Sequence, residues 1–288
     1  MKRRFNQVDV FTATPLRGNP LAVVHAANGL DDAAMAAFAR WTNLSETTFL
    51  LPPTDAAADY RVRIFTPGGE LPFAGHPTLG SCWAWLAAGG VPKQAGMVVQ
   101  ECGVGLVRVR LQDGRLAPEG AGFGRLWFAA PPLRRAGPLD DELLQRIVAA
   151  IGVSPGDVLH HQWVDNGPGW CALMLRSAAA VLAVRVDGAL LGDVKLGLVG
   201  AHPAGSECAF ELRALYPGPG GLVEDPVTGS LNASVAQWLI SAGLAPPRYV
   251  AAQGTLLQRA GRVHIEHVEG TMWVGGDVTP LIDGEVAL

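Results

Sequence analysis

The chain has 288 residues, of which 49% are hydrophobic and 17% are charged. This composition predicts a folded protein with a large core, and the length allows one large domain or two of ordinary size. The formal net charge of −4 gives no electrostatic reason for binding nucleic acid. The basic residues 2–4 are followed by Asp9 instead of an apolar stretch, so we expect no secretory signal and a cytoplasmic protein.

Short strands separated by turn residues dominate the first half of the chain. Strands are predicted at residues 5–11 and 21–24, and a helix capped by Asp31 or Asp32 is predicted to end at about Trp41. Further strands are expected at residues 47–51, 60–65, 97–101, 105–111 and 126–128.

The second half follows a proline-rich segment at residues 131–138, which suits a linker. A helix is predicted at residues 140–151. Strands are expected near residues 162–163, 171–175, 194–199 and 208–215, with a final set over 249–274. Many short strands with two central helices favour a pair of α+β, barrel-like domains over a βαβ repeat.

Two runs of 22 residues contain no Asp, Glu, Lys or Arg, and they lie between Glu70 and Lys93 and between Asp225 and Arg248. Their length alone is that of a membrane helix. Both runs, however, begin with proline and glycine, so only about a dozen residues of each can be regular helix. We therefore predict two short, almost fully buried helices and no membrane span.

The sequence before each run is similar as well. Residues 60–68 and 210–218 match at a constant offset of 150, sharing an arginine and a Pro-Gly pair. Continued without a gap, this register places Thr78 on Thr228 and residues 75–78 on residues 225–228. Internal duplication is the economical interpretation, and it predicts two similar halves.

The sequence lacks several motifs that bind cofactors or that carry a catalytic nucleophile. It contains no G-x-G-x-x-G that opens a helix, no P-loop and no G-x-S-x-G nucleophile elbow. His264 and His267 lie on a predicted strand, where side chains three apart point to opposite faces. The four cysteines include no CxxC pair and are expected to be reduced. We predict neither a metal nor a cofactor.

Three loops carry ionisable residues in apolar or turn-forming surroundings: residues 43–49 with Glu46, residues 73–80 with His76, and residues 224–230 with Asp225. In the last two, small residues open a helix whose backbone N–H groups would suit a carboxylate. Convergence of the three side chains in a cleft between the halves would allow proton transfer at carbon without a cofactor. Alternatively, Glu46 lies in a surface turn, His76 simply begins a helix, and Asp225 is an N-cap.

These loops and several other segments, taken in order, resemble the PhzF-like phenazine-biosynthesis family. The similar segments span nearly the whole chain and are residues 9–12, 18–24, 43–47, 65–67, 70–80, 224–230, 253–254 and 261–262. The resemblance implies that Glu46, His76 and Asp225 are catalytic and that Ser45, Gly75, Gly229 and Ser230 contact the substrate. The type member of the family isomerises trans-2,3-dihydro-3-hydroxyanthranilate.

The same resemblance implies an α+β, diaminopimelate-epimerase-like fold of two similar domains, each a mixed β-barrel around a central helix. The domains are expected at residues 1–125, completed by residues 275–288, and at residues 126–274. The active site is expected between them, acting on a small anionic substrate without a cofactor. A homodimer is a further implication of the resemblance.

Two other functions stay open at this point. One is an epimerase or racemase of a small amino or hydroxy acid that uses carboxylate and histidine bases. Epimerases with a pair of thiols are disfavoured, because neither matching loop contains a cysteine. The other is a non-catalytic protein that binds a small molecule in the same cleft. The segment 231–234 departs from the phenazine enzyme's own pattern, so the resemblance does not define the chemistry of the pocket beyond the three catalytic positions.

Overall fold

The computed structural model describes residues 1–112, 123–218 and 220–288. Clustering of the chain gives two compact units. Unit 1 comprises Met1–Ala129 and Gly275–Leu288, and unit 2 comprises Ala130–Val274. Each unit is an α+β structure with its own set of strands, and each is described separately below.

Unit 1 is built from strands that pack around one helix. Its elements are β1 (Lys2–Val10), β2 (Asn19–Val24), α1 (Asp32–Thr42), β3 (Glu46–Leu51), β4 (Tyr60–Thr66), β5 (Gly69–Leu71), α2 (Gly75–Ala87), β6 (Met97–Cys102), β7 (Gly105–Leu111), β8 (Leu126–Ala129) and β17 (Val278–Ala287).

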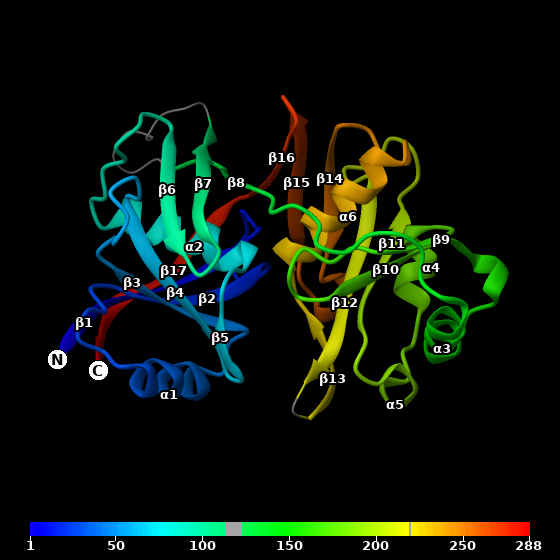
Figure 1. Cartoon of the computed structure of the whole chain (residues 1–288), viewed down its shortest axis with the longest axis horizontal. Coiled ribbons are helices and arrows are strands. Elements are labelled where there is room, and N and C mark those ends of the chain that lie inside the picture. Colours follow the sequence, from blue (N-terminus) through cyan, green and yellow to red (C-terminus); the bar gives the residue numbers. More distant parts are fainter. Residues whose placement is uncertain (113–122, 219) are drawn as a thin grey trace. The chain divides into compact units, whose positions relative to one another are not determined.

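Neighbouring strands of unit 1 pair mostly in chain order. β1 and β2 are antiparallel, β2 and β3 parallel, β3 and β4 antiparallel, β4 and β6 parallel, and β6 and β7 antiparallel. β17 runs antiparallel to β1, so the two ends of the chain lie side by side (Figure 1). The sequence pattern did not predict β17, because its Leu281 and Ile282 are exposed and give no alternating buried face.

Unit 2 contains the remaining elements. They are α3 (Asp141–Ile151), the short 3₁₀ helix Pro155–Asp157, β9 (Val158–Trp163), β10 (Trp170–Leu175), α4 (Ala178–Ala183), α5 (Gly188–Leu191), β11 (Lys195–Ala201), β12 (Phe210–Gly218), β13 (Gly221–Asp225), α6 (Gly229–Ser241), β14 (Arg248–Gln253), a second 3₁₀ helix Thr255–Leu257 and β15 (Gly261–Val268). The chain returns to unit 1 within β16 (Thr271–Gly276).

The pairing in unit 2 repeats that of unit 1. β9 and β10 are antiparallel, β10 and β11 parallel, β11 and β12 antiparallel, β12 and β14 parallel, and β14 and β15 antiparallel. In both units a hairpin, β4–β5 or β12–β13, leads directly into a buried helix. The two units therefore share one topology, as the duplicated sequence predicts.

The ungapped register across the duplicated segment is wrong beyond the turn. The β4–β5 turn pairs Thr66 with Gly69, whereas the β12–β13 turn pairs Gly218 with Gly221, so the second hairpin is two residues longer on each strand. The strands remain 150 positions apart, but Gly75 and Gly229, which begin the two helices, are 154 apart. Thr78 therefore corresponds to Asn232 and not to Thr228.

The helix α2 occupies the centre of unit 1. Most of its side chains are buried, and it contacts β1, β2, β3, β4, β6, β7, β8 and β17. Gly80 allows this close approach, since a Cβ at that position would lie 2.5 Å from Leu21 Cδ2. The helix α6 is equally buried in unit 2. A helix buried on all sides must be apolar all round, which explains the two uncharged runs.

One bidentate ion pair closes each hairpin. Arg63 donates from Nε and Nη2 to the two carboxylate oxygens of Glu70, at 2.7 and 2.6 Å. Arg213 makes the same pair with Glu224, at 3.1 and 2.9 Å. The Arg63 pair is partly exposed, whereas the side chains of Arg213 and Glu224 are only 7% and 12% exposed.

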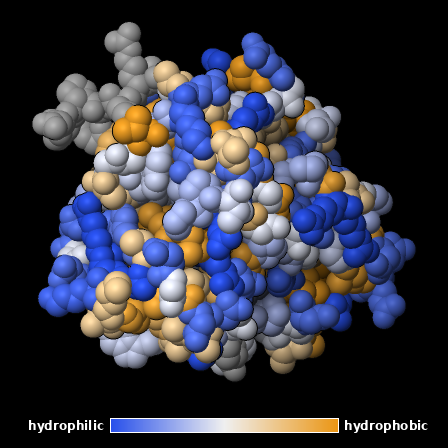
Figure 2. Space-filling view, turned by 60° about the vertical axis from the view of Figure 1, so that its left-hand side comes forward, coloured by the Kyte–Doolittle hydropathy of each residue, from blue (hydrophilic) through white to orange (hydrophobic). Residues whose placement is uncertain are grey.

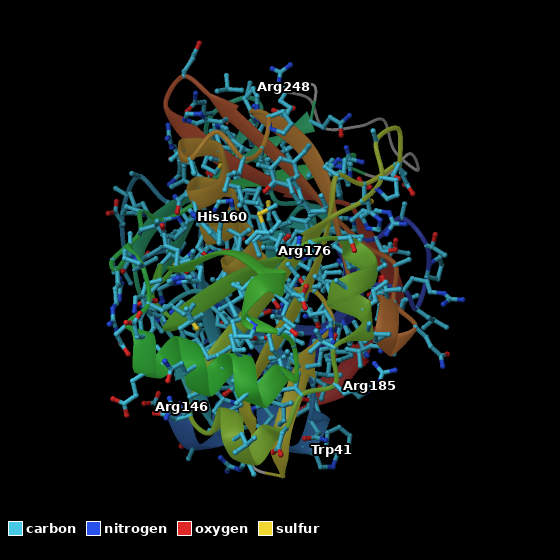
Figure 3. The ribbon with its side chains drawn as sticks, turned by 90° about the vertical axis from the view of Figure 1, so that its right-hand side faces the viewer. Trp41, Arg146, His160, Arg176, Arg185 and Arg248 are labelled. Carbon is cyan, nitrogen blue, oxygen red and sulfur yellow. The ribbon has the colours of Figure 1, made fainter. Side chains whose placement is uncertain are left out.

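The surface and the cysteines complete the description of the fold. Hydrophilic and hydrophobic residues are intermixed over the face shown in Figure 2. Figure 3 shows Arg146 and Arg176 at the surface of unit 2, and each pairs with an aspartate, Asp193 at 3.5 Å and Asp157 at 2.9 Å. The four cysteines are free thiols. In the part of the chain that the structure describes, no helix is long and apolar enough to cross a membrane.

The two ion pairs predict unequal effects on stability. Arg213→Met leaves the Glu224 carboxylate without its partner in a buried position and should lower the free energy of unfolding by about 3–5 kcal/mol. Arg63→Met, at the equivalent and more exposed position, should lower it by less than about 1 kcal/mol. Urea unfolding of both variants measures the difference, and equal losses would contradict this assignment.

The burial of His25 predicts that the free energy of unfolding falls in mild acid. Its Nε2 lies 2.7 Å from Asn6 Oδ1, and burial lowers its pKa from 6.5 to about 4. Between pH 6.5 and pH 4 the His25 ring is protonated in the unfolded chain but neutral in the folded protein. His25 should therefore lower the free energy of unfolding by about 2 kcal/mol from pH 7 to pH 5. His25→Gln should flatten the pH dependence by that amount, as measured by urea unfolding at both pH values.

Candidate active site

Glu46 lies where a helix gives way to a strand. α1 ends at Thr42, and its C-cap Asn43 has a φ of 53°, a left-handed conformation that asparagine tolerates and that turns the chain out of the helix. After Ser45, which is half-buried, Glu46 begins β3 and pairs with Leu21 of the parallel strand β2. Its side chain is 14% exposed. Glu46 is therefore not in a surface turn.

His76 is the second residue of α2 and is buried. Its Nε2 lies 3.3 Å from Glu46 Oε2, and its Nδ1 lies 3.4 Å from the side-chain nitrogen of Asn19. Asn19 itself is fully buried at the start of β2. The structure thus brings together the first and second of the three predicted loops, within unit 1.

The surroundings of His76 fix its protonation. Burial lowers its pKa from 6.5 to about 3, so the ring is neutral at pH 7. The Asn19 amide nitrogen donates to Nδ1, which must then be the unprotonated ring nitrogen. Nε2 consequently carries the hydrogen, and it lies 3.3 Å from Glu46 Oε2 without the geometry of a hydrogen bond. The imidazole therefore places no positive charge beside the Glu46 carboxyl group.

The two central helices differ from the others at their N-termini. α1, α3, α4 and α5 each begin with a side-chain cap, from Asp31, Asp140, Ser177 and Asp187 respectively. The N-cap residues of α2 and α6, Ala74 and Thr228, provide no such cap. An N-terminus without a side-chain cap presents backbone N–H groups and the positive end of the helix dipole to an anion.

The third predicted loop lies in unit 2. Asp225 is the last residue of β13, and its Oδ2 accepts a hydrogen bond from Thr228 Oγ1 at 2.6 Å. Because Thr228 is the N-cap residue of α6, the alternative of Asp225 as an N-cap is wrong. Gly229 and Ser230 form the first turn of α6, and Ser230 Oγ accepts a hydrogen bond from Trp170 Nε1 at 3.1 Å.

Sequence reasoning missed Asn19 as a member of the site. Residues 18–20 lie between the strands predicted at residues 5–11 and 21–24, and their glycine, asparagine and proline are the usual residues of a turn. An asparagine that begins a buried strand is the signal that could have identified it, since its amide must find a partner inside the protein.

In residues 1–112, 123–218 and 220–288, no group of three or more His, Cys, Asp or Glu side chains is placed to hold a metal ion. His264 and His267 lie on β15, as the sequence predicts.

The chain as a whole is similar to several known proteins. The family model described as "Phenazine biosynthesis-like protein" matches residues 8–284. An uncharacterized isomerase of Mesorhizobium japonicum is 34% identical over 99% of this chain and 98% of its own. The trans-2,3-dihydro-3-hydroxyanthranilate isomerase of Pseudomonas aeruginosa is 33% identical over 81% of this chain and 78% of its own.

Solved structures show the same relationship. The structure of a predicted epimerase from Pseudomonas aeruginosa superimposes with a TM-score of 0.79, at 31% sequence identity and with 99% of both chains covered. The fold is thus the α+β, diaminopimelate-epimerase-like fold of two similar domains. From the matched family model, the relatives and the shared fold, we conclude that the chain belongs to the phenazine biosynthesis-like (PhzC-PhzF) family and is an isomerase.

Proposed function

We propose that this protein is a cofactor-independent isomerase that moves a proton between carbon atoms of a small, carboxylated, conjugated substrate. Trans-2,3-dihydro-3-hydroxyanthranilate, on which the Pseudomonas aeruginosa relative is named to act, is the candidate substrate. The observation that carries the proposal is the 3.3 Å approach of His76 Nε2 to Glu46 Oε2 at the uncapped N-terminus of α2.

Glu46 is the proposed general base. A neutral imidazole provides a hydrogen-bond donor without the cationic charge that would strongly weaken a carboxylate as a base. Glu46 takes a proton from one carbon, the electron pair shifts along the conjugated system, and the Glu46 carboxyl group, whose proton exchanges with solvent, delivers a proton to another carbon. One C–H bond breaks and one forms, so the reaction is balanced without an oxidant or reductant.

The uncapped helix N-termini are the proposed binding groups for the substrate's carboxylate. In α2 these are the N–H groups of Gly75 and His76, and in α6 those of Gly229 and Ser230. We propose that Ser45 lies beside the base and that Asp225 accepts a hydrogen bond from a substrate amino or hydroxyl group.

Racemisation by a pair of thiols does not suit these loops. Cys82 lies inside α2, where burial raises the pKa of its thiol. Cys208 precedes β12, and burial also raises its pKa. Both shifts disfavour the thiolate that such chemistry requires.

The role of Glu46 predicts a loss of proton exchange. With trans-2,3-dihydro-3-hydroxyanthranilate in D₂O, Glu46→Gln should reduce deuterium incorporation at carbon by at least about 100-fold, because a general base contributes on the order of 10²–10⁴. Asp225→Asn should also slow the reaction, because it removes the carboxylate that we propose to accept a hydrogen bond from the substrate. NMR of the recovered substrate and product measures the incorporation.

Glu285→Gln is the control, since Glu285 is an exposed glutamate of β17 that pairs with Lys2. It should exchange at the rate of the unchanged protein. Incorporation that persists in Glu46→Gln would overturn the role of Glu46. Absence of exchange in the unchanged protein, together with exchange of the α-proton of a chiral amino acid, would favour an epimerase instead.

The tautomer of His76 is a second, substrate-independent prediction. In the unchanged protein, ¹⁵N NMR should show an unprotonated Nδ1 and a protonated Nε2. Asn19→Asp replaces the donor by an acceptor, which should move the ring proton to Nδ1 or protonate both nitrogens. The ring of His25, which is hydrogen bonded to Asn6, provides the reference signal. A protonated Nδ1 in the unchanged protein would contradict the assignment.

A further inference from the structure

Gln253 forms a buried hydrogen-bonded hub beside Asp225. It ends β14 and is 1% exposed. Its Oε1 accepts from the Thr228 N–H at 3.0 Å and from Asn232 Nδ2 at 2.8 Å. Its Nε2 donates to the Asp225 carbonyl at 3.0 Å and to Thr228 Oγ1 at 2.9 Å. Both oxygen lone pairs and both amide hydrogens are therefore used.

The direction of each hydrogen bond in this hub is determined. A backbone N–H can only donate, so the Thr228 N–H fixes the side of the Gln253 amide that carries oxygen. The amide nitrogen must then face Thr228 Oγ1, which accepts from it. A hydroxyl has one hydrogen, and that hydrogen is left to point at Asp225 Oδ2, 2.6 Å away.

From this chain of contacts we propose that Gln253 is a positioning residue that, through the Thr228 hydroxyl, holds the Asp225 carboxylate in one orientation and in its ionised form. A hydrogen bond donated to a carboxylate favours the ionised state. An oriented carboxylate at the N-terminus of α6 accepts hydrogen bonds from a substrate ammonium, amino or hydroxyl group. That consequence for catalysis rests on the proposed function. The chain of hydrogen bonds from Gln253 through the Thr228 hydroxyl to Asp225, called the relay below, does not.

Packing holds the hub rigid. Gly254, directly after Gln253, has a φ of +88°, and a Cβ there would lie 2.5 Å from the Pro226 carbonyl oxygen. A Cβ on Gly261 would lie 2.4 Å from Val227 Cγ2. The segment 225–228 therefore packs closely against Gly254 and Gly261, on the side where Gln253 is hydrogen bonded to it. This close packing leaves the backbone of the segment little room to shift.

Unit 1 has a different network at the start of its central helix, and there Cys102, not Gln100, occupies the position of Gln253. There the Gln100 amide donates to the Thr78 hydroxyl at 3.0 Å, and that hydroxyl donates to the Ala74 carbonyl at 2.9 Å. The N-cap residue is Ala74, which has no hydroxyl, so the chain of bonds ends on the backbone. In unit 2 the N-cap residue is Thr228, and its hydroxyl carries the chain to a carboxylate.

The relay can be tested by titrating Asp225 directly. In protein labelled with ¹³C at aspartate carboxyls, the Asp225 signal is assigned by its loss in Asp225→Asn. Thr228→Val, which removes the hydroxyl and keeps the branched shape, should raise the titration midpoint of Asp225 by about one pH unit or more. Thr228→Ser retains the hydroxyl and should leave the midpoint unchanged.

Gln253→Glu provides a second variant of similar shape. Its introduced carboxylate would accept the Thr228 hydroxyl hydrogen and so withdraw it from Asp225, again raising the midpoint. Ser234→Ala is the matched control, because Ser234 is buried in α6 and donates to the Leu231 carbonyl at 3.1 Å. An unchanged midpoint in both Thr228→Val and Gln253→Glu, or an equal rise in Ser234→Ala, would overturn the relay.

A turnover experiment separates the relay from the proposed function. The acid limb of the pH profile of deuterium exchange should move to higher pH in Thr228→Val and not in Thr228→Ser. If the carboxyl midpoint shifts while the unchanged protein shows no exchange with trans-2,3-dihydro-3-hydroxyanthranilate, the relay stands and the proposed reaction fails. If exchange occurs and the midpoint does not shift, the reaction stands and the relay fails.

Discussion

The burial of one apolar helix at the centre of each unit is the constraint on which the rest of this structure depends. A helix surrounded by strands must be apolar on every face, yet its first N–H groups remain polar and need partners. In α2 and α6 the N-cap residues, Ala74 and Thr228, provide no side-chain cap for these N–H groups. Each unit therefore places its polar loops and its ionisable residues at the same point, the start of its central helix.

The Glu46–His76 pair follows from that burial. The interior that surrounds α2 lowers the pKa of His76 and keeps the ring neutral, and Asn19 selects which ring nitrogen holds the hydrogen. A histidine at an exposed helix start would be protonated near pH 6 and would form an ordinary ion pair with the glutamate. The burial that stabilises the unit thus keeps a cationic charge away from the Glu46 carboxyl group.

The hairpins show how a duplicated unit can diverge without losing its fold. Arg63 with Glu70 and Arg213 with Glu224 keep the same bidentate pairing, although the second hairpin is two residues longer on each strand. Asp225 occupies the position that Leu71 has in unit 1, three residues before the N-cap of the central helix, and Thr228 and Gln253 hold it there. In unit 1 the carboxyl group beside the start of the helix comes from β3 instead, at Glu46.

The sequence by itself determined the two uncharged helices, the repeated strand and hairpin, the α+β class and the three loops that carry Glu46, His76 and Asp225. These features are local, since hydrophobic periodicity, turn residues and repeated segments are visible without knowing what packs where. Only the tertiary structure decided that Thr78 corresponds to Asn232, that Thr228 and not Asp225 precedes α6, and that Asn19 and Gln253 belong to the polar networks. The physical reason is that strand pairing and buried hydrogen bonds join residues tens of positions apart, such as Asn19 with His76 and Thr228 with Gln253, and their geometry leaves no local pattern in the chain.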